Sequence, residues 1–155
     1  MIIEPAAILE PTFRVDPALF EKVRRQQMQL LDGGIERWTA AERFRAGADF
    51  HEAIVECSGN RFLFDALRNV NQLRRVIEYH SQTGSTQDRT RMRRQCEEHL
   101  VLLDLLEAGE RMEASHMLRQ HLDVVGAIKT GDRPRAKAPE TMEMVDSSLA
   151  VQVHL

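Results

Sequence analysis

The chain has 155 residues, of which 43% are hydrophobic, 29% are charged and only 5% are aromatic, and its formal net charge is −3. This composition is typical of one soluble, helix-rich domain, and the small negative charge argues against a domain that binds nucleic acid by neutralising phosphates. No stretch is long and apolar enough to span a membrane, and no secretory signal is apparent. The two cysteines stand in no metal-binding or redox spacing, so we expect a cytoplasmic protein without disulfides.

Proline, glycine and capping residues divide the first part of the chain into two elements. A short element of at most two turns is bracketed by Pro5 and Pro11. A helix then begins after Asp16, which is a favourable N-cap, with Pro17 at the first helical position. The glycines at 33–34 are expected to end this helix.

Four longer helices are predicted downstream from apolar residues at helical spacing, over about 35–57, 61–81, 87–108 and 111–129. Short turns join them, so we expect an all-α antiparallel bundle of about six helices over residues 1–130. Residues 131–155 form a C-terminal tail. Its last segment, LAVQVHL, alternates like a strand but is equally compatible with an ordered tail or a partner-binding segment.

Three of the six histidines fall on the apolar faces of three different helices. Each helical residue advances by about 100°, which places His51, His99 and His121 among apolar neighbours on the inward side. These neighbours are Phe44, Ile54 and Val55 in the first helix, Met92, Leu103 and Leu106 in the second, and Ala114, Leu118 and Val125 in the third. The other histidines, His80, His116 and His154, are expected at the surface.

Three imidazoles that converge in a dry core predict a metal site. Neutral imidazoles each need a hydrogen-bond partner there, whereas protonated ones would repel one another. A divalent metal ion removes the conflict, and imidazole ligands suit zinc, nickel, copper or iron, of which zinc and nickel are the first candidates. The alternative is that each histidine is a buried core residue held by hydrogen bonds.

Four segments of the sequence resemble the FCD domain, which is the C-terminal effector-binding domain of FadR-type regulators within the bacterial GntR family, and they occur in the same order as in that domain. They are IEPAAILEPTFRVDPA, DFHEAIVECSGN, EEHLVLLDLLEAGE and ASHMLRQHL. The resemblance covers about residues 2–129. It implies a helical bundle that forms homodimers and binds a small organic acid at its centre. Many members hold a metal ion there with one Asp and three His, and the three His positions correspond to His51, His99 and His121.

The sequence departs from the family pattern in two ways. The family Asp lies four residues before the first His, and this position is Gly47 here. Asp49 does not replace it, because it lies about 200° away from His51 around the helix. Two alternatives follow: a metal ion bound by the three histidines together with water or a bound acid, or a site without a metal ion. The resemblance also implies a winged-helix DNA-binding domain, which we expect to be absent from this chain, so that contact with DNA would need a domain supplied elsewhere.

Polar residues of the expected pocket are candidates for binding the acid. These candidates are Arg43, Asn71, Arg74 and Arg75. For each arginine the alternative is an exposed side chain that contacts only solvent.

We therefore expect a non-enzymatic sensing and dimerisation domain. A metal-dependent enzyme that acts on a small acid is the second hypothesis. It is disfavoured because Glu97 and Glu98, the acids beside His99, are expected to point to other faces. The third hypothesis is a structural dimerisation module without a ligand.

Overall fold

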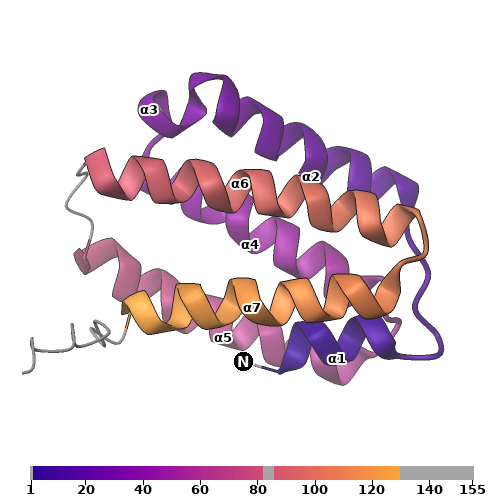
Figure 1. Cartoon of the computed structure of the whole chain (residues 1–155). Coiled ribbons are helices and arrows are strands. Elements are labelled where there is room, and N and C mark those ends of the chain that lie inside the picture. The colour runs from indigo at the N-terminus through magenta and orange to yellow at the C-terminus, as the bar shows by residue number, and fades with distance from the viewer. Residues whose placement is uncertain (1, 82–85, 130–155) are drawn as a thin grey trace, which may run out of the picture.

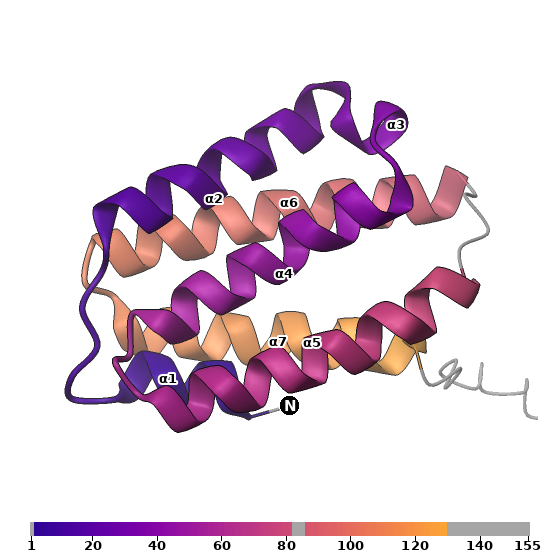
Figure 2. The same cartoon turned by 180° about the vertical axis from the view of Figure 1, so that it is seen from behind.

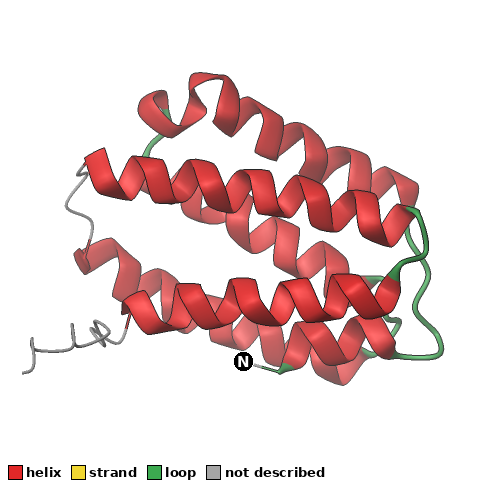
Figure 3. Cartoon of the chain, viewed as in Figure 1, coloured by secondary structure: helices red, strands yellow, loops and turns green. Residues whose placement is uncertain are grey.

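The computed structural model describes residues 2–81 and 86–129. Within these ranges the chain is helical, without strands, as Figure 3 shows. The elements are α1 (Ile3–Leu9), α2 (Pro17–Gln29), a π-helical turn (Leu30–Gly34), α3 (Ile35–Arg37), α4 (Ala40–Glu56), α5 (Arg61–Ser81), α6 (Thr86–Glu107) and α7 (Arg111–Lys129). The prediction of an all-α bundle is confirmed. None of these helices is both long and apolar enough to cross a bilayer.

The four long helices α4 to α7 form the body of the bundle. Helix α6 lies beside α7, and α4 lies beside α5 on the opposite side (Figures 1 and 2). Helix α2 covers the edge formed by α4 and α6, whereas the short α1 packs against α4, α5 and α7. Helices α1 and α2 from the start of the chain and α7 from the end of the described part therefore pack around one shared interior.

Local capping explains where several helices begin and end. The Oδ1 atom of Asp16 accepts hydrogen bonds from the backbone amides of Ala18 and Leu19, so the predicted N-cap of α2 is confirmed. Asn60 caps α5 in the same way. Helix α1 differs from the prediction, because it begins before Pro5 and includes it. This is possible because an amide in the first turn of a helix has no helical partner to lose.

The predicted helix over 35–57 is interrupted, and this expectation was wrong. Trp38 adopts an extended backbone conformation, with φ −75° and ψ 148°. Thr39 then starts α4 with a capping box, in which its hydroxyl accepts from the amide of Glu42 and the carboxylate of Glu42 accepts from the amide of Thr39. The short α3 therefore belongs to the connection between α2 and α4.

The glycines at 33–34 redirect the chain within a π-helical turn. Gly33 has a φ of +87°, and a Cβ atom at Gly34 would lie 2.6 Å from the carbonyl oxygen of Gln29. Both positions therefore need glycine, one for its backbone conformation and one for space. The predicted end of α2 lies at this turn, which leads directly into α3.

A continuous apolar core fills the space between α2, α4, α6 and α7. Its fully buried large side chains include Phe20, Phe50, Ile54, Leu102, Leu103, Leu106 and Leu118. His116 is exposed, as expected. The side chains of His80 and His154 and the C-terminal tail lie outside the described residues.

Candidate metal and ligand site

The structure brings three predicted histidines together inside the bundle. His51 extends from α4, His99 from α6 and His121 from α7, and one ring nitrogen of each lies within 4.8 Å of the others. The ring centroids are 4.7–5.7 Å apart. His99 and His121 are buried, whereas His51 is partly buried, and all three border the same cavity. Helical periodicity thus places all three imidazoles in one cluster.

The Nδ1 atom of each imidazole faces an oxygen of another helix. His99 Nδ1 lies 2.9 Å from Oε1 of Gln27, and His121 Nδ1 lies 2.6 Å from Oε2 of Glu98. His51 Nδ1 lies 3.1 Å from Oε1 of Glu4. The oxygens of Gln27 and Glu98 are acceptors, so His99 and His121 are assigned the tautomer with the proton on Nδ1 and the lone pair on Nε2. The contact between His51 Nδ1 and Glu4 is not aligned as a hydrogen bond.

Two of these lone pairs face each other. The Nε2 atoms of His99 and His121 lie 3.1 Å apart, yet neither donates a proton if both Nδ1 atoms do. Two nitrogen ligands about 2.1 Å from one zinc ion would be about 3.0–3.4 Å apart for bond angles of roughly 90–109°. The pair of His99 and His121 therefore fits a divalent ion bound at its two Nε2 atoms, with Nδ1 held by outer acceptors, as is usual for histidine ligands. A ring nitrogen of His51 within 4.8 Å is available as the third ligand.

Burial keeps two of the histidines neutral near pH 7. Desolvation holds the pKa of His99 well below its ordinary value, and the neighbouring His51 and His121 lower it further. Desolvation and His51 also lower the pKa of His121, although Glu98 and Glu4 act in the opposite direction. The neutral imidazole is the form that binds a metal ion.

Glu4 brings a carboxylate into the interior from α1. The residue is 0% exposed, and its two oxygens make no well-aligned hydrogen bond within the described part of the chain. Burial raises the pKa of Glu4, but the interaction with His51 and the charge of Arg74 outweigh burial, so that the pKa lies below its ordinary value. Glu4 is therefore a buried anion.

The histidines border a cavity of about 140 Å³ that also contains several of the predicted ligand-binding residues. Arg43, Asn71 and Arg74 line it, whereas Arg75 is exposed and does not. Arg43 donates hydrogen bonds to the carbonyl oxygens of Ile35 and Trp38. Asn71 donates to Oε1 of Glu52 at 3.0 Å, which leaves its carbonyl oxygen as an acceptor.

A comparison with protein families identifies the domain. The model of the FCD domain matches residues 1–124. The chain belongs to the FCD domain family. Comparison with curated proteins and with solved structures gave no match. The resemblance seen in the sequence is thus confirmed, and it places the chain with the regulatory effector-binding domains of GntR- and FadR-type regulators.

The position of the family Asp is open space in this FCD domain. Gly47 lines the cavity, and a Cβ atom built there meets nothing within 4 Å. Asp49 pairs with Arg45 at 3.2 Å and accepts a hydrogen bond from Gln26, in agreement with its predicted direction away from His51. The site therefore lacks a carboxylate at position 47 and keeps the room for one.

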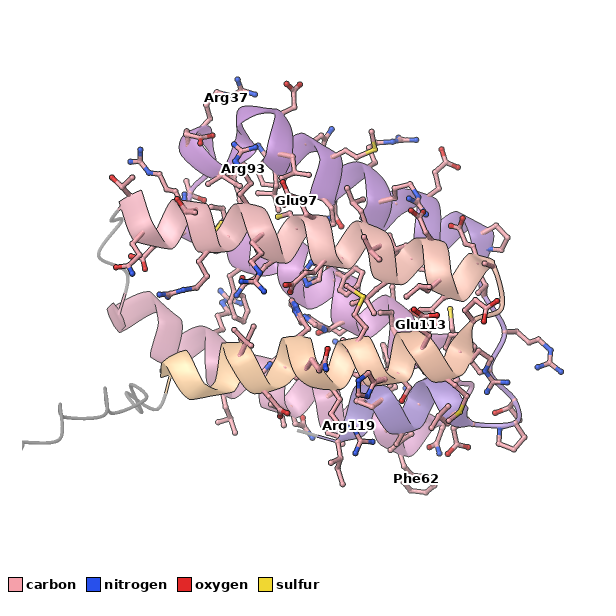
Figure 4. All side chains as sticks on the ribbon, viewed as in Figure 1. Arg37, Phe62, Arg93, Glu97, Glu113 and Arg119 are labelled. Atoms are coloured by element: carbon pink, nitrogen blue, oxygen red, sulfur yellow. The ribbon has the colours of Figure 1, made fainter. Side chains whose placement is uncertain are left out.

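One expectation about the acids beside His99 was wrong. Glu97 is exposed and lies on the edge of α6 away from α7, as Figure 4 shows, but Glu98 reaches across to His121. The side-by-side packing of α6 and α7 and the length of the glutamate side chain explain this contact. The position of Glu98 on the helical wheel alone does not reveal it.

Gln27 and Glu4 are site residues that the predicted histidine stripes do not include. Gln27 is fully buried on α2, and its amide also donates to the carbonyl oxygen of Ala46. A signal for Glu4 exists in the sequence, because Ala7 and Ile8 follow it at helical spacing and both are 0% exposed. A charged residue on such an apolar face needs a partner in the interior.

Proposed function

We propose that this FCD domain senses a small organic acid through a divalent metal ion held by His51, His99 and His121. The observation that carries the proposal is the convergence of the three imidazoles, with each Nδ1 atom directed at an acceptor. This arrangement gathers one ring nitrogen of each histidine within 4.8 Å of the others, and the Nε2 atoms of His99 and His121 lie 3.1 Å apart. When bound, the ion, for which zinc and nickel are the first candidates, supplies a Lewis-acid site for a carboxylate.

The cavity beside the histidines offers the remaining contacts for an acid. The open space at Gly47 leaves room for a carboxylate of the ligand where a family Asp would otherwise lie. Arg74 provides positive charge in the cavity wall, and the carbonyl oxygen of Asn71 can accept a hydrogen bond from a hydroxyl group. Arg43 borders the same space. These groups favour a small hydroxy acid or sugar acid over an apolar ligand.

Regulation by this domain would require a second copy of the chain and a DNA-binding domain. We expect the domain to form a homodimer and to act on DNA only through a winged-helix domain. Binding of the acid would then change the arrangement of the DNA-binding domains, because the acid would contact α4, α5, α6 and α7 at once.

Metal analysis of the purified protein tests the central claim. We expect about one zinc or nickel ion per chain in the wild-type protein and loss of that ion in His51→Ala. The matched control is His116→Ala, which removes an exposed imidazole from α7 and should leave the metal content unchanged. Equal metal content in His51→Ala and the wild type would contradict the proposed ligand set.

A ligand screen follows on the metal-loaded protein. Small hydroxy acids and sugar acids should raise the unfolding temperature of the wild type, and this shift should disappear in His51→Ala. Chromatography of the acid after incubation separates a sensor from an enzyme. Unchanged acid supports the sensor, whereas turnover that depends on the metal would support the second hypothesis.

A further inference from the structure

We infer that Glu4 is the positioning carboxylate of this metal site and that it supplies, from α1, the negative charge that position 47 lacks. This inference rests on the proposed function. Glu4 is assigned to hold the Nδ1–H group of His51, and thereby to orient His51 Nε2 toward the ion. The short helix α1 then forms part of the metal site.

Burial makes a purely structural role for Glu4 costly. A carboxylate at 0% exposure loses its hydration, and neither oxygen recovers it through a well-aligned hydrogen bond in the described part of the chain. An isolated buried carboxylate is strongly unfavourable unless a positive group compensates it. His51 Nδ1 lies 3.1 Å from Oε1 of Glu4 and faces this carboxylate across the interior.

The charges around the site indicate what the compensating group is. Three neutral imidazoles carry no charge, so a dication bound to them would have no balancing anion among its ligands. Glu98 balances part of this charge, but its side chain is 26% exposed, whereas that of Glu4 is 0% exposed. Glu4 also interacts electrostatically with His121 and with Arg74, so its charge acts on more than one wall of the site.

The packing of α1 explains how so short a helix contributes to the site. It contacts α4 and α7, the helices that carry His51 and His121, and it also contacts α5. Ser115 on α7 donates to the carbonyl oxygen of Pro5, and Arg111 donates to the carbonyl oxygen of Ile8. Both contacts anchor α1 to α7 at residues that follow Glu4 along the helix, one of them directly adjacent to it, and so hold its carboxylate near His51.

The direct test compares Co²⁺ and Zn²⁺ affinity in the wild type and in Glu4→Gln. This change keeps the shape of the side chain and removes its charge. We expect an affinity lower by about 10- to 100-fold, the effect typical of an outer partner of a histidine ligand. The control is Glu113→Gln, which removes the same charge from an exposed position on α7 and should bind both ions like the wild type. The absorption bands of bound Co²⁺ should keep their shape, because the three nitrogen ligands remain.

A second variant separates charge from folding. Gly47→Asp adds a carboxylate where a Cβ atom meets nothing within 4 Å. Introduced into Glu4→Gln, it should restore most of the lost affinity. Thermal unfolding of each metal-free variant checks that the comparison is between folded proteins.

The outcomes are distinguishable. Wild-type affinity in Glu4→Gln, or no recovery in the double variant, would overturn the role of Glu4 and leave the histidine site standing. New Co²⁺ bands in Glu4→Gln would make Glu4 a direct ligand and overturn the positioning role. Absence of metal binding by the wild type would overturn the proposed metal site together with this inference.

Discussion

The Nε2 atoms of His99 and His121 lie 3.1 Å apart, although each ring directs its Nδ1 atom at an oxygen acceptor. In neutral rings with protonated Nδ1 atoms, both Nε2 atoms are acceptors, and no proton lies between them. A hydrogen bond between the rings would need one ring to give up its Nδ1 proton or to become charged. A bound cation instead satisfies both lone pairs without changing either tautomer.

Replacing Gln27 by leucine should weaken metal binding. Gln27→Leu removes the oxygen 2.9 Å from His99 Nδ1 and keeps a side chain of similar volume in a fully buried position. Without this acceptor the His99 ring can adopt the tautomer with a protonated Nε2, which cannot bind the ion through that nitrogen. We expect a decrease in zinc affinity of about 10- to 100-fold, measured by competition with a chromophoric chelator.

The neighbouring residue provides the control for this change. The amide of Gln26 donates to Asp49 and not to a histidine. Gln26→Leu should therefore keep the zinc affinity of the wild type. Equal losses in both variants would show that the effect arises from the packing of α2 and not from the acceptor.

Removing the metal should lower the free energy of unfolding. A ligand that binds only the folded state stabilises it by about 4 kcal/mol when its free concentration is 1,000 times the dissociation constant. Urea unfolding with and without a chelator measures this difference. His99→Ala should show no difference between the two conditions, and an equal chelator effect in this variant would contradict ligation by His99.

Arg74 and Arg75 are adjacent on α5, but only Arg74 lines the cavity. Arg74→Ala should reduce the affinity for an organic acid by about 1.5–3 kcal/mol, the contribution of a hydrogen bond to a charged group. Arg75→Ala carries the same change of charge at an exposed position and should bind like the wild type. Isothermal titration of the metal-loaded proteins makes the comparison, and equal losses would indicate a general charge effect.

The fold and the three histidines could be predicted because both depend on local periodicity. A spacing of 3.6 residues per turn fixes which face of a long helix is buried, and hence the inward direction of His51, His99 and His121. The caps at Asp16 and Asn60 are likewise local signals. The break before α4 was also readable, since Thr39 and Glu42 stand at capping-box spacing.

The acceptors around the histidines depend on tertiary packing. Gln27 lies 72 positions from His99 along the chain, and only the packing of α2 on α6 brings them together. Glu4 meets His51 because α1 packs on α4, and Glu98 bends from α6 toward α7. A single sequence specifies none of these pairings in advance, since each depends on which helices become neighbours.

The thiol of Cys96 should be unreactive in the folded protein. Burial raises its pKa to about 12; Arg93 opposes this rise and Glu97 adds to it, and the residue is 2% exposed. Compared with its ordinary pKa of 9.0, this makes the thiolate fraction at pH 8 roughly 1,000 times smaller. Cys57→Ser leaves Cys96 as the single cysteine, so that its reaction with a thiol reagent can be followed alone. We expect slow labelling that becomes fast in denaturant, whereas rapid labelling under native conditions would contradict the burial of Cys96.

The metal-free protein should lose stability as the pH falls from about 7 to 5. The pKa of His99 in the folded state lies well below its ordinary value, and that of His121 is also lowered, mainly through burial and the neighbouring His51. In the unfolded state both side chains titrate near about 6.5. The unfolded chain therefore takes up protons first, so that the stability present above about pH 6.5 decreases as the pH falls below it. Glu98 and Glu4 lie near His121 and reduce the contribution of His121 to this pH dependence, which leaves His99 as the main contributor.

Urea unfolding in the presence of a chelator at pH 8, 7, 6 and 5 measures how the free energy of unfolding changes with pH, and His99→Gln should make this change smaller. Stability that is constant or rises toward pH 5 would contradict the burial of neutral imidazoles in this core.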